Sequence, residues 1–182
     1  MTNDALIKEI GEAFSGVPKP QTTLRVARGA DDHDYDWKKL QKLDEHYYDW
    51  EDVPDEDLDY YQDIFYWLCP QGFQFYLPAY MSRMLRTLSS NRPNHIWPMW
   101  AFGERCFELN LFELFTRKQT AVTVRFLEVL FEKVKDDYHA DWWNHFDAED
   151  WDDDELRKAR KLELWEDYGA AYQLLKAKLG SE

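Results

Sequence analysis

Aspartates at alternate positions are the residues of this chain whose spacing most directly suggests metal chemistry. They alternate in three places, at residues 32–36, 55–59 and 150–154. A calcium loop of the EF-hand type also needs glycine at its sixth position and a bidentate glutamate at its twelfth. None of the three runs has either residue at those positions. The spacing therefore argues against dedicated calcium sites.

Histidine, cysteine and glycine patterns give no further chemistry. The five histidines form no HExxH pair, and Cys69 and Cys106 show no paired metal or redox spacing. His139 and His145 lie near aspartates, but histidines in acidic loops are more often solvated than ligating. The GxGxxG, GxxxxGK and GxSxG motifs are all missing from the sequence. We therefore expect no metal and no cofactor, and we favour a protein that is not an enzyme.

Aromatic side chains among carboxylates are the remaining chemical signal. The stretch DEHYYDWEDVPDEDLDYYQDIFYW over residues 44–67 consists mostly of these two types. Tryptophan and tyrosine anchor protein interfaces, and carboxylates steer a basic partner. The alternative is that these rings fold back over the ends of the fold. The candidate partner-binding residues are Tyr47, Tyr48, Asp49, Trp50, Glu51, Asp52, Trp142, Trp143, Asp147, Asp150 and Trp151.

The charge is uneven along the chain. The formal net charge is −14, with fourteen acids against three bases in residues 31–63 and ten acids without a base in residues 136–155. Such a field favours a basic protein partner and disfavours nucleic acid or an anionic membrane as partners. The alternative is a solvated surface that only keeps the protein in solution. Charge alone does not indicate the oligomeric state.

Apolar residues at helical spacing predict most of the elements. We expect helices over about residues 4–15, 37–47, 54–68, 78–88, 117–138 and 153–179. Thr116 and Gln119 have the spacing of a capping box at the start of the fifth of these helices. Pro78 should prevent a single helix over residues 71–88, because proline lacks the N–H and clashes one turn back. TTLRVARG, over residues 22–29, could form one short strand.

These elements predict an all-α fold, an irregular helical bundle of about five to six helices with at most one short strand. The 182 residues suit one domain, with an irregular acidic connector at 17–36 and an acidic Trp-rich loop at 139–152. No apolar run reaches the roughly 18 residues of a membrane-spanning helix. The first residues lack the basic and apolar pattern of a secretory signal, so we expect a cytoplasmic location.

Three blocks of sequence carry a family resemblance. They are AFSGVPKP at 13–20, the block from Phe73 to Tyr80 that ends in YLPAY, and the segment from Thr116 to Leu127. In these blocks the chain resembles an uncharacterised bacterial family of small cytoplasmic proteins, a domain of unknown function. The resemblance covers most of residues 5–130. It implies a fold but brings no activity or cofactor.

Three functions remain open from the sequence. The first is a non-enzymatic acidic protein-binding module, for example an immunity or antitoxin-like inhibitor of a basic toxin or nuclease, with a nucleic-acid mimic as a variant. The second is an unrecognised enzyme or small-molecule binder with an aromatic pocket. The third is an assembly subunit that docks through its last helix. The pocket of the second hypothesis would be lined by Tyr76, Tyr80, Trp97 and Trp100.

Overall fold

The structure is a computed structural model that describes residues 2–33, 36–44, 47–61, 64–87, 102, 109–134 and 169–180. Within these ranges every regular element is a helix, so the predicted all-α fold is confirmed. The organisation as one domain stays a prediction. The elements in chain order are α1 (Asn3–Phe14), α2 (Leu24–Asp31), α3 (Trp37–Leu43), η1 (Trp50–Asp52), α4 (Asp55–Tyr60), η2 (Ile64–Trp67), α5 (Pro70–Thr87), α7 (Arg117–Val134) and a C-terminal helix over residues 169–180.

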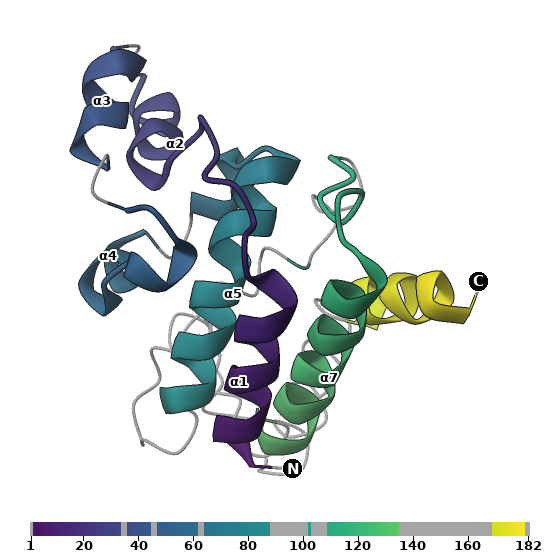
Figure 1. Cartoon of the computed structure of the whole chain (residues 1–182). Helices are drawn as coiled ribbons and strands as arrows, with labels where there is room; N and C mark the ends of the chain where they lie inside the picture. The colour runs from purple at the N-terminus through teal and green to yellow at the C-terminus, as the bar shows by residue number, and fades with distance from the viewer. Residues whose placement is uncertain are drawn as a thin grey trace, which may run out of the picture.

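Helices α1, α5 and α7 form the layer on which the other elements pack, with α1 between the other two (Figure 1). Helix α1 runs antiparallel to both neighbours. The Asn3 side chain at its start donates to the Leu85 carbonyl near the end of α5, at 2.7 Å. Glu12 near its end lies 3.8 Å from Lys118 at the start of α7. Helices α2 and α3 lie together at the end of the layer where α5 begins.

The local sequence explains why α1 occupies the middle of the layer. The Thr2 hydroxyl caps its first turn by accepting from the Ala5 N–H at 3.3 Å. Leu6, Ile10 and Phe14 recur every four residues and are fully buried. A turn with Gly16 at φ +75° follows the helix, a conformation that glycine adopts without steric cost.

Helix α5 corrects the expectation that Pro78 would interrupt the segment over residues 71–88. It is continuous from Pro70 to Thr87 with Pro78 inside it. Proline at the first helical position is favourable because the missing N–H has no partner there anyway. At Pro78 the helix loses the bond to the Gln74 carbonyl. Burial of apolar side chains on both flanks offsets this loss, since almost every residue from Phe73 to Leu85 is buried.

Helix α2 replaces the short strand expected at residues 22–29 and much of the irregular connector expected at 17–36. The Thr23 hydroxyl accepts from the Val26 N–H at 3.3 Å and so starts a helix. Leu24 and Ala27 then fall on one helical face and are fully buried. A single β-branched Val26 does not outweigh this cap and this face.

The predicted second and third helices are shorter than expected. Helix α3 ends at Leu43 rather than near residue 47, and it contains no buried residue. The expected helix over 54–68 divides into α4 and the 3-10 turn η2. The division still buries the predicted face, because Leu58, Tyr61 and Ile64 all lie in the core.

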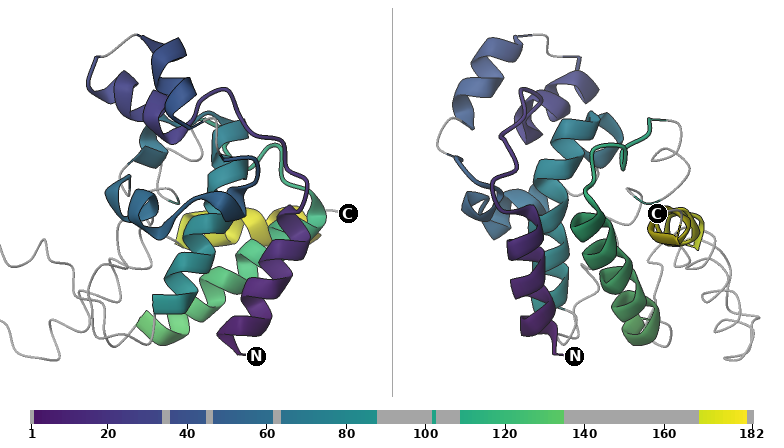
Figure 2. Two further views of the ribbon diagram at one scale, coloured as in Figure 1. Left: turned by 60° about the vertical axis from the view of Figure 1, so that its left-hand side comes forward. Right: turned by 45° about the vertical axis from the view of Figure 1, so that its right-hand side comes forward.

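The C-terminal helix runs crosswise to α7 (Figure 2). The Tyr172 hydroxyl donates to Glu128 of α7 at 3.0 Å, and the Lys178 ammonium donates to the Phe112 carbonyl at 2.8 Å. The expected start of this helix near residue 153 and the predicted loop at 139–152 lie outside the described residues. No helix in the described part of the chain is long and apolar enough to cross a membrane.

The predicted capping box at the start of α7 is confirmed. The Thr116 hydroxyl accepts from the Gln119 N–H at 3.2 Å, and the Gln119 amide oxygen accepts from the Thr116 N–H at 2.9 Å. The same amide oxygen accepts from Gln74 of α5 at 3.0 Å. The cap therefore joins the start of α7 to α5.

Replacing Thr116 with alanine tests this cap. We expect Thr116→Ala to lower the free energy of unfolding by about 1 kcal/mol, because the Gln119 N–H loses its acceptor. Thr116→Ser keeps the hydroxyl and should restore most of the loss. Urea denaturation followed by circular dichroism measures both variants. Equal stability of the alanine and serine variants would show that the hydroxyl does not cap α7.

Candidate functional site

The residues predicted to bind a partner divide into buried and exposed ones. Tyr47 and Trp50 belong to the core, with exposed fractions of 2% and 5%. Their burial corrects the idea that these two rings face a partner, and it matches the alternative in which the rings fold back. Tyr48 is 83% exposed, and Glu51 and Asp52 are also exposed.

The carboxylates beside Tyr48 partly serve the backbone. Asp49 and Asp52 form a capping box that closes η1. Asp52 accepts from the Tyr48 N–H at 2.9 Å and from the Asp49 N–H at 2.8 Å. Glu51 is different, because no described residue forms an ion pair with its carboxylate. The predicted residues Trp142, Trp143, Asp147, Asp150 and Trp151 lie outside the described residues.

Arginines of α5 neutralise much of the acidic start of α4. Arg86 lies 2.7 Å from Asp55, and Arg83 lies 2.9 Å from Asp59. These pairs are partly exposed, so each adds little stability, but together they fix how α4 lies on α5. The aspartates that suggested a steering surface are therefore partly structural.

Of the four residues predicted to line an aromatic pocket, the structure describes two. Tyr76 and Tyr80 are buried inside the core. The Tyr80 hydroxyl is used internally, because it donates to the Tyr61 carbonyl at 2.7 Å. Trp97 and Trp100 lie outside the described residues.

A buried polar cluster holds α2 and α3 against α4. Asp44, fully buried, accepts from the Arg25 guanidinium at 2.9 Å. Arg25 also donates to the Tyr61 hydroxyl at 2.9 Å and lies 3.5 Å from Asp57. The Tyr47 hydroxyl donates to Asp57 and closes the cluster. Every charge in this cluster has a partner, so it is a structural network rather than a binding site.

The same cluster raises the pKa of its tyrosines. Burial raises the pKa of Tyr47 well above its usual range, and the hydrogen bond to Asp57 and the charge of Asp57 add to the effect. Burial also raises the pKa of Tyr76, with a further contribution from the negative charge of Asp44. Both phenols therefore stay neutral at a pH at which an ordinary phenol ionises.

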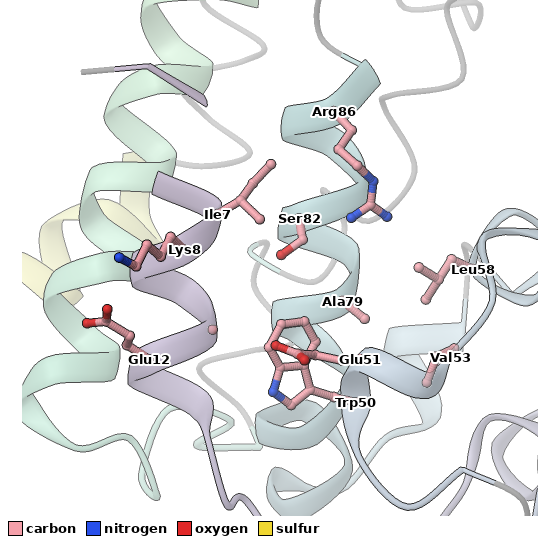
Figure 3. Close-up of a pocket in the computed structure, with 11 residues that line it drawn as sticks. Ile7, Lys8, Glu12, Trp50, Glu51, Val53, Leu58, Ala79, Ser82 and Arg86 are labelled. Carbon is pink, nitrogen blue, oxygen red and sulfur yellow. The ribbon is translucent and has the colours of Figure 1, made fainter. Parts of the chain in front are cut away.

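A cavity of about 500 Å³ opens between α1, η1, α4 and α5 (Figure 3). All four elements contribute apolar side chains to its wall. These side chains are Ile7, Trp50, Val53, Leu58 and Ala79. Its polar groups are Lys8, Glu12, Glu51, Ser82 and Arg86. Gly11 lets η1 approach α1, because a Cβ there would lie 3.3 Å from the Glu51 carboxylate.

Ser82 is the unusual residue of this cavity. It is only 2% exposed, and its hydroxyl has no hydrogen-bond partner. Its oxygen points from α5 toward α1, into the space between the two helices (Figure 3). The buried hydroxyls of Thr120 and Thr123 on α7 instead donate to carbonyls one turn back, at 3.0 Å and 2.9 Å. A buried hydroxyl without a partner costs about 1 to 3 kcal/mol, so its retention points to a use.

The charges around the cavity are of both signs. Arg86 and Glu51 lie at opposite ends, with Ser82 between them (Figure 3). Lys8 and Glu12 on α1 form the rim, and their charged ends point away from the centre. The four charges of the lining sum to zero.

A metal site is not favoured by the described residues. No three of their histidine, cysteine, aspartate and glutamate side chains come together as ligands of one ion. The cavity offers Glu51 and Glu12 as carboxylates, together with two cations. What the arrangement can do is bind a small polar molecule, because it combines an apolar wall with a few directed polar groups.

Ser82 and Arg86 are not among the site residues predicted from the sequence. The signal that could have found them is their spacing, because residues four apart share one face of a helix. A serine at a position of the buried stripe of α5 breaks the apolar pattern of that stripe. Their position opposite Glu51 depends on how η1 packs on α5, which no local pattern predicts.

The comparisons with known proteins identify a family and nothing closer. Residues 2–156 match a family of unknown function (DUF6714), so the chain belongs to that family. The match includes α1 to α7 and therefore every element of the cavity. No curated protein and no solved structure matches the chain.

The raised pKa values of the buried tyrosines predict a loss of stability at high pH. A phenol whose pKa is raised by folding gives stability that is fully present below about pH 10, the unfolded value, and is lost as the pH rises toward the folded value. We therefore expect the free energy of unfolding to fall as the pH rises above about 10, and to keep falling at higher pH. Tyr76→Phe should reduce this slope, by up to about 1.4 kcal/mol per pH unit.

Tyr48→Phe is the matched control, because the Tyr48 ring is exposed. Urea denaturation at several pH values gives the slope for each protein. If Tyr76→Phe and Tyr48→Phe lose stability with pH as steeply as the parent chain, the burial of Tyr76 does not govern the pH dependence.

Proposed function

We propose that this member of a family of unknown function binds a small molecule in the cavity between α1, η1, α4 and α5. The observation that carries the proposal is the buried Ser82 hydroxyl without a partner. A ligand that donates to or accepts from this oxygen would supply the missing hydrogen bond. The cost of the unpaired group is then recovered in the bound state.

The dimensions and lining of the cavity support the same proposal. Its volume of about 500 Å³ lies within the range of roughly 300 to 1,000 Å³ that small-molecule sites have. Two elements position the polar groups that face the cavity. Ser82 and Arg86 lie on the 18-residue helix α5, and the capping box of η1 fixes the backbone that carries Glu51. Such a site is formed before the ligand arrives, which reduces the entropy lost on binding.

The acidic turn around Tyr48 supports a second candidate function, the binding of a basic protein. An exposed aromatic ring beside the exposed Glu51 and Asp52 has the composition of an interface anchor. The net charge of −14 would speed the encounter with such a partner. An immunity or antitoxin-like inhibitor is one protein of this kind. Arg83 and Arg86 pair with aspartates of α4, so fewer carboxylates are left to attract a basic partner. This candidate is therefore the weaker of the two.

Removing the Ser82 hydroxyl tests the first function. We expect Ser82→Ala to leave the free energy of unfolding unchanged or to raise it by up to about 1 kcal/mol, because an unsatisfied buried group disappears. The matched variant Thr123→Val removes a buried hydroxyl that donates to the Gln119 carbonyl at 2.9 Å. It should lose about 1 kcal/mol. Urea denaturation measures both.

The contrast between the two variants is the informative result. A binding site keeps a group that costs stability, whereas a structural hydroxyl contributes to it. If Ser82→Ala destabilises the chain as much as Thr123→Val does, the Ser82 hydroxyl has a structural partner. The proposal would then lose the observation that carries it.

The second function is tested with small basic proteins of known sequence, immobilised at about 0.05 M salt. We expect Tyr48→Ala to weaken binding by about tenfold, because an exposed aromatic anchor is lost. Leu174→Ala is the control, since Leu174 is an exposed apolar residue of the C-terminal helix. Binding that resists about 0.5 M salt, or that falls equally in both variants, would contradict steering by the acidic turn.

A further inference from the structure

We propose that the ligand of the cavity is a zwitterion, a molecule with a carboxylate and an ammonium group joined by an apolar body, such as an amino acid or a short peptide. The inference rests on the proposed small-molecule function and names the ligand class for that site. It follows from three features of the lining: a cation with unused donors, a carboxylate without an ion-pair partner, and a buried hydroxyl between them.

The carboxylate of such a ligand fits the end of the cavity formed by Ser82 and Arg86. These two residues are four apart on α5, so they share one face of the helix. Arg86 uses its Nη2 for Asp55, at 2.7 Å. A guanidinium has five N–H donors, so donors remain for a second carboxylate. The Ser82 hydroxyl has no partner and can donate to the same group.

The ammonium group fits the opposite end, where Glu51 lies. The Glu51 carboxylate has no ion-pair partner among the described residues and lies against the backbone of α1 at Gly11. Trp50 lines the cavity as well. A carboxylate without an ion-pair partner is a favourable place for an ammonium group, because it attracts a cation and accepts its hydrogen bonds.

Apolar side chains lie between the two ends. Ala79 is one turn from Ser82 on α5, and Ile7 faces Ser82 from α1 (Figure 3). Val53 and Leu58 complete the wall from the side of α4. This wall fits a hydrocarbon body, because apolar surface is stabilised when it is removed from water.

Ligands of one charge fit less well. A simple anion would pair with Arg86 but would enter a space that Glu51 also lines, and a simple amine would meet the reverse problem. The lining charge of zero is matched by a ligand whose own charges sum to zero. Because the cation and the carboxylate lie at opposite ends of the cavity, the ligand would be oriented along α5.

Matched sets of probes test the ligand class. Leucine, isocaproate and isoamylamine share one hydrocarbon body, and they carry both charged groups, the carboxylate only and the ammonium only. Phenylalanine, hydrocinnamate and phenethylamine form a second set with a larger body. Isothermal titration calorimetry on the full chain gives the affinity for each. We expect at least one amino acid to bind about tenfold more tightly than either of its halves, since each half lacks one ion pair.

Glu51→Gln identifies which end holds the ammonium group. It should weaken amino-acid binding by about tenfold, so that the amino acid binds no better than its carboxylate half, and it should not weaken the binding of that half. Glu56→Gln is the control, because Glu56 is exposed on α4 and does not line the cavity. It should change neither affinity.

Several outcomes would contradict the proposal that the ligand is a zwitterion. One is binding of a half as tight as that of its amino acid. A second is an equal effect of Glu51→Gln and Glu56→Gln, and a third is the failure of both probe sets to bind. The small-molecule function is tested separately, by comparing how Ser82→Ala and Thr123→Val change the free energy of unfolding. If a half binds tightly and Ser82→Ala abolishes that binding, the function stands and only the ligand class is wrong.

Discussion

The buried carboxylate of Asp44 is the group on which the N-terminal half of the fold depends. Placing an ion in the interior costs several kcal/mol unless a partner of opposite charge and hydrogen bonds compensate it. Arg25 supplies both, through its guanidinium at 2.9 Å and its backbone N–H at 3.3 Å. Because Asp44 follows α3 and Arg25 lies in α2, this pair fixes these two short helices, and α3 itself buries nothing. One further hydrogen bond, from the Gln41 side chain of α3 to the Gln21 carbonyl at 2.8 Å, adds to this pair.

The effect of this pair extends to the cavity. Arg25 also contacts Asp57 in the first turn of the short helix α4 and Tyr61, the residue just after this helix. Tyr47, which lies just before η1, donates its hydroxyl hydrogen to Asp57 as well. Helix α4 and η1 provide one wall of the cavity, and α1 and α5 provide the other. The position of Glu51 opposite Ser82 is therefore set by a charge network that lies outside the cavity, together with the arginines of α5 that hold α4 from the other side.

The sequence predicts the long amphipathic helices of this fold well. The four-residue repeat of Leu6, Ile10 and Phe14 and the capping box at Thr116 are local signals, and both elements form as expected. It predicts less well where tertiary burial outweighs local preference. Pro78 stays inside α5 because its neighbours are buried on all sides, and the strand expected around Val26 is a helix.

The candidate site was harder to predict than the fold. Composition shows acids and aromatics together, but it does not show that Tyr47 and Trp50 turn inward while Tyr48 stays exposed. Tyr47 and Tyr48 are adjacent and have the same neighbours in the sequence. Only the packing of the folded chain decides which of the two rings is buried. The cavity joins residues from α1, η1 and α5 that are far apart in the sequence. A serine in a buried helical stripe is the one local signal that the sequence offered.

The central proposal is that a small molecule enters the cavity beside Ser82. Methyl-labelled NMR spectra of the full chain during titration with the two probe sets test it most directly, because Ile7, Val53 and Leu58 carry methyl groups on the cavity wall. The account predicts chemical-shift changes in these methyl groups, and none in Val124 or Leu130, which lie in the buried part of α7. Changes confined to other parts of the fold, or none in the wall methyl groups while a probe binds, would contradict it.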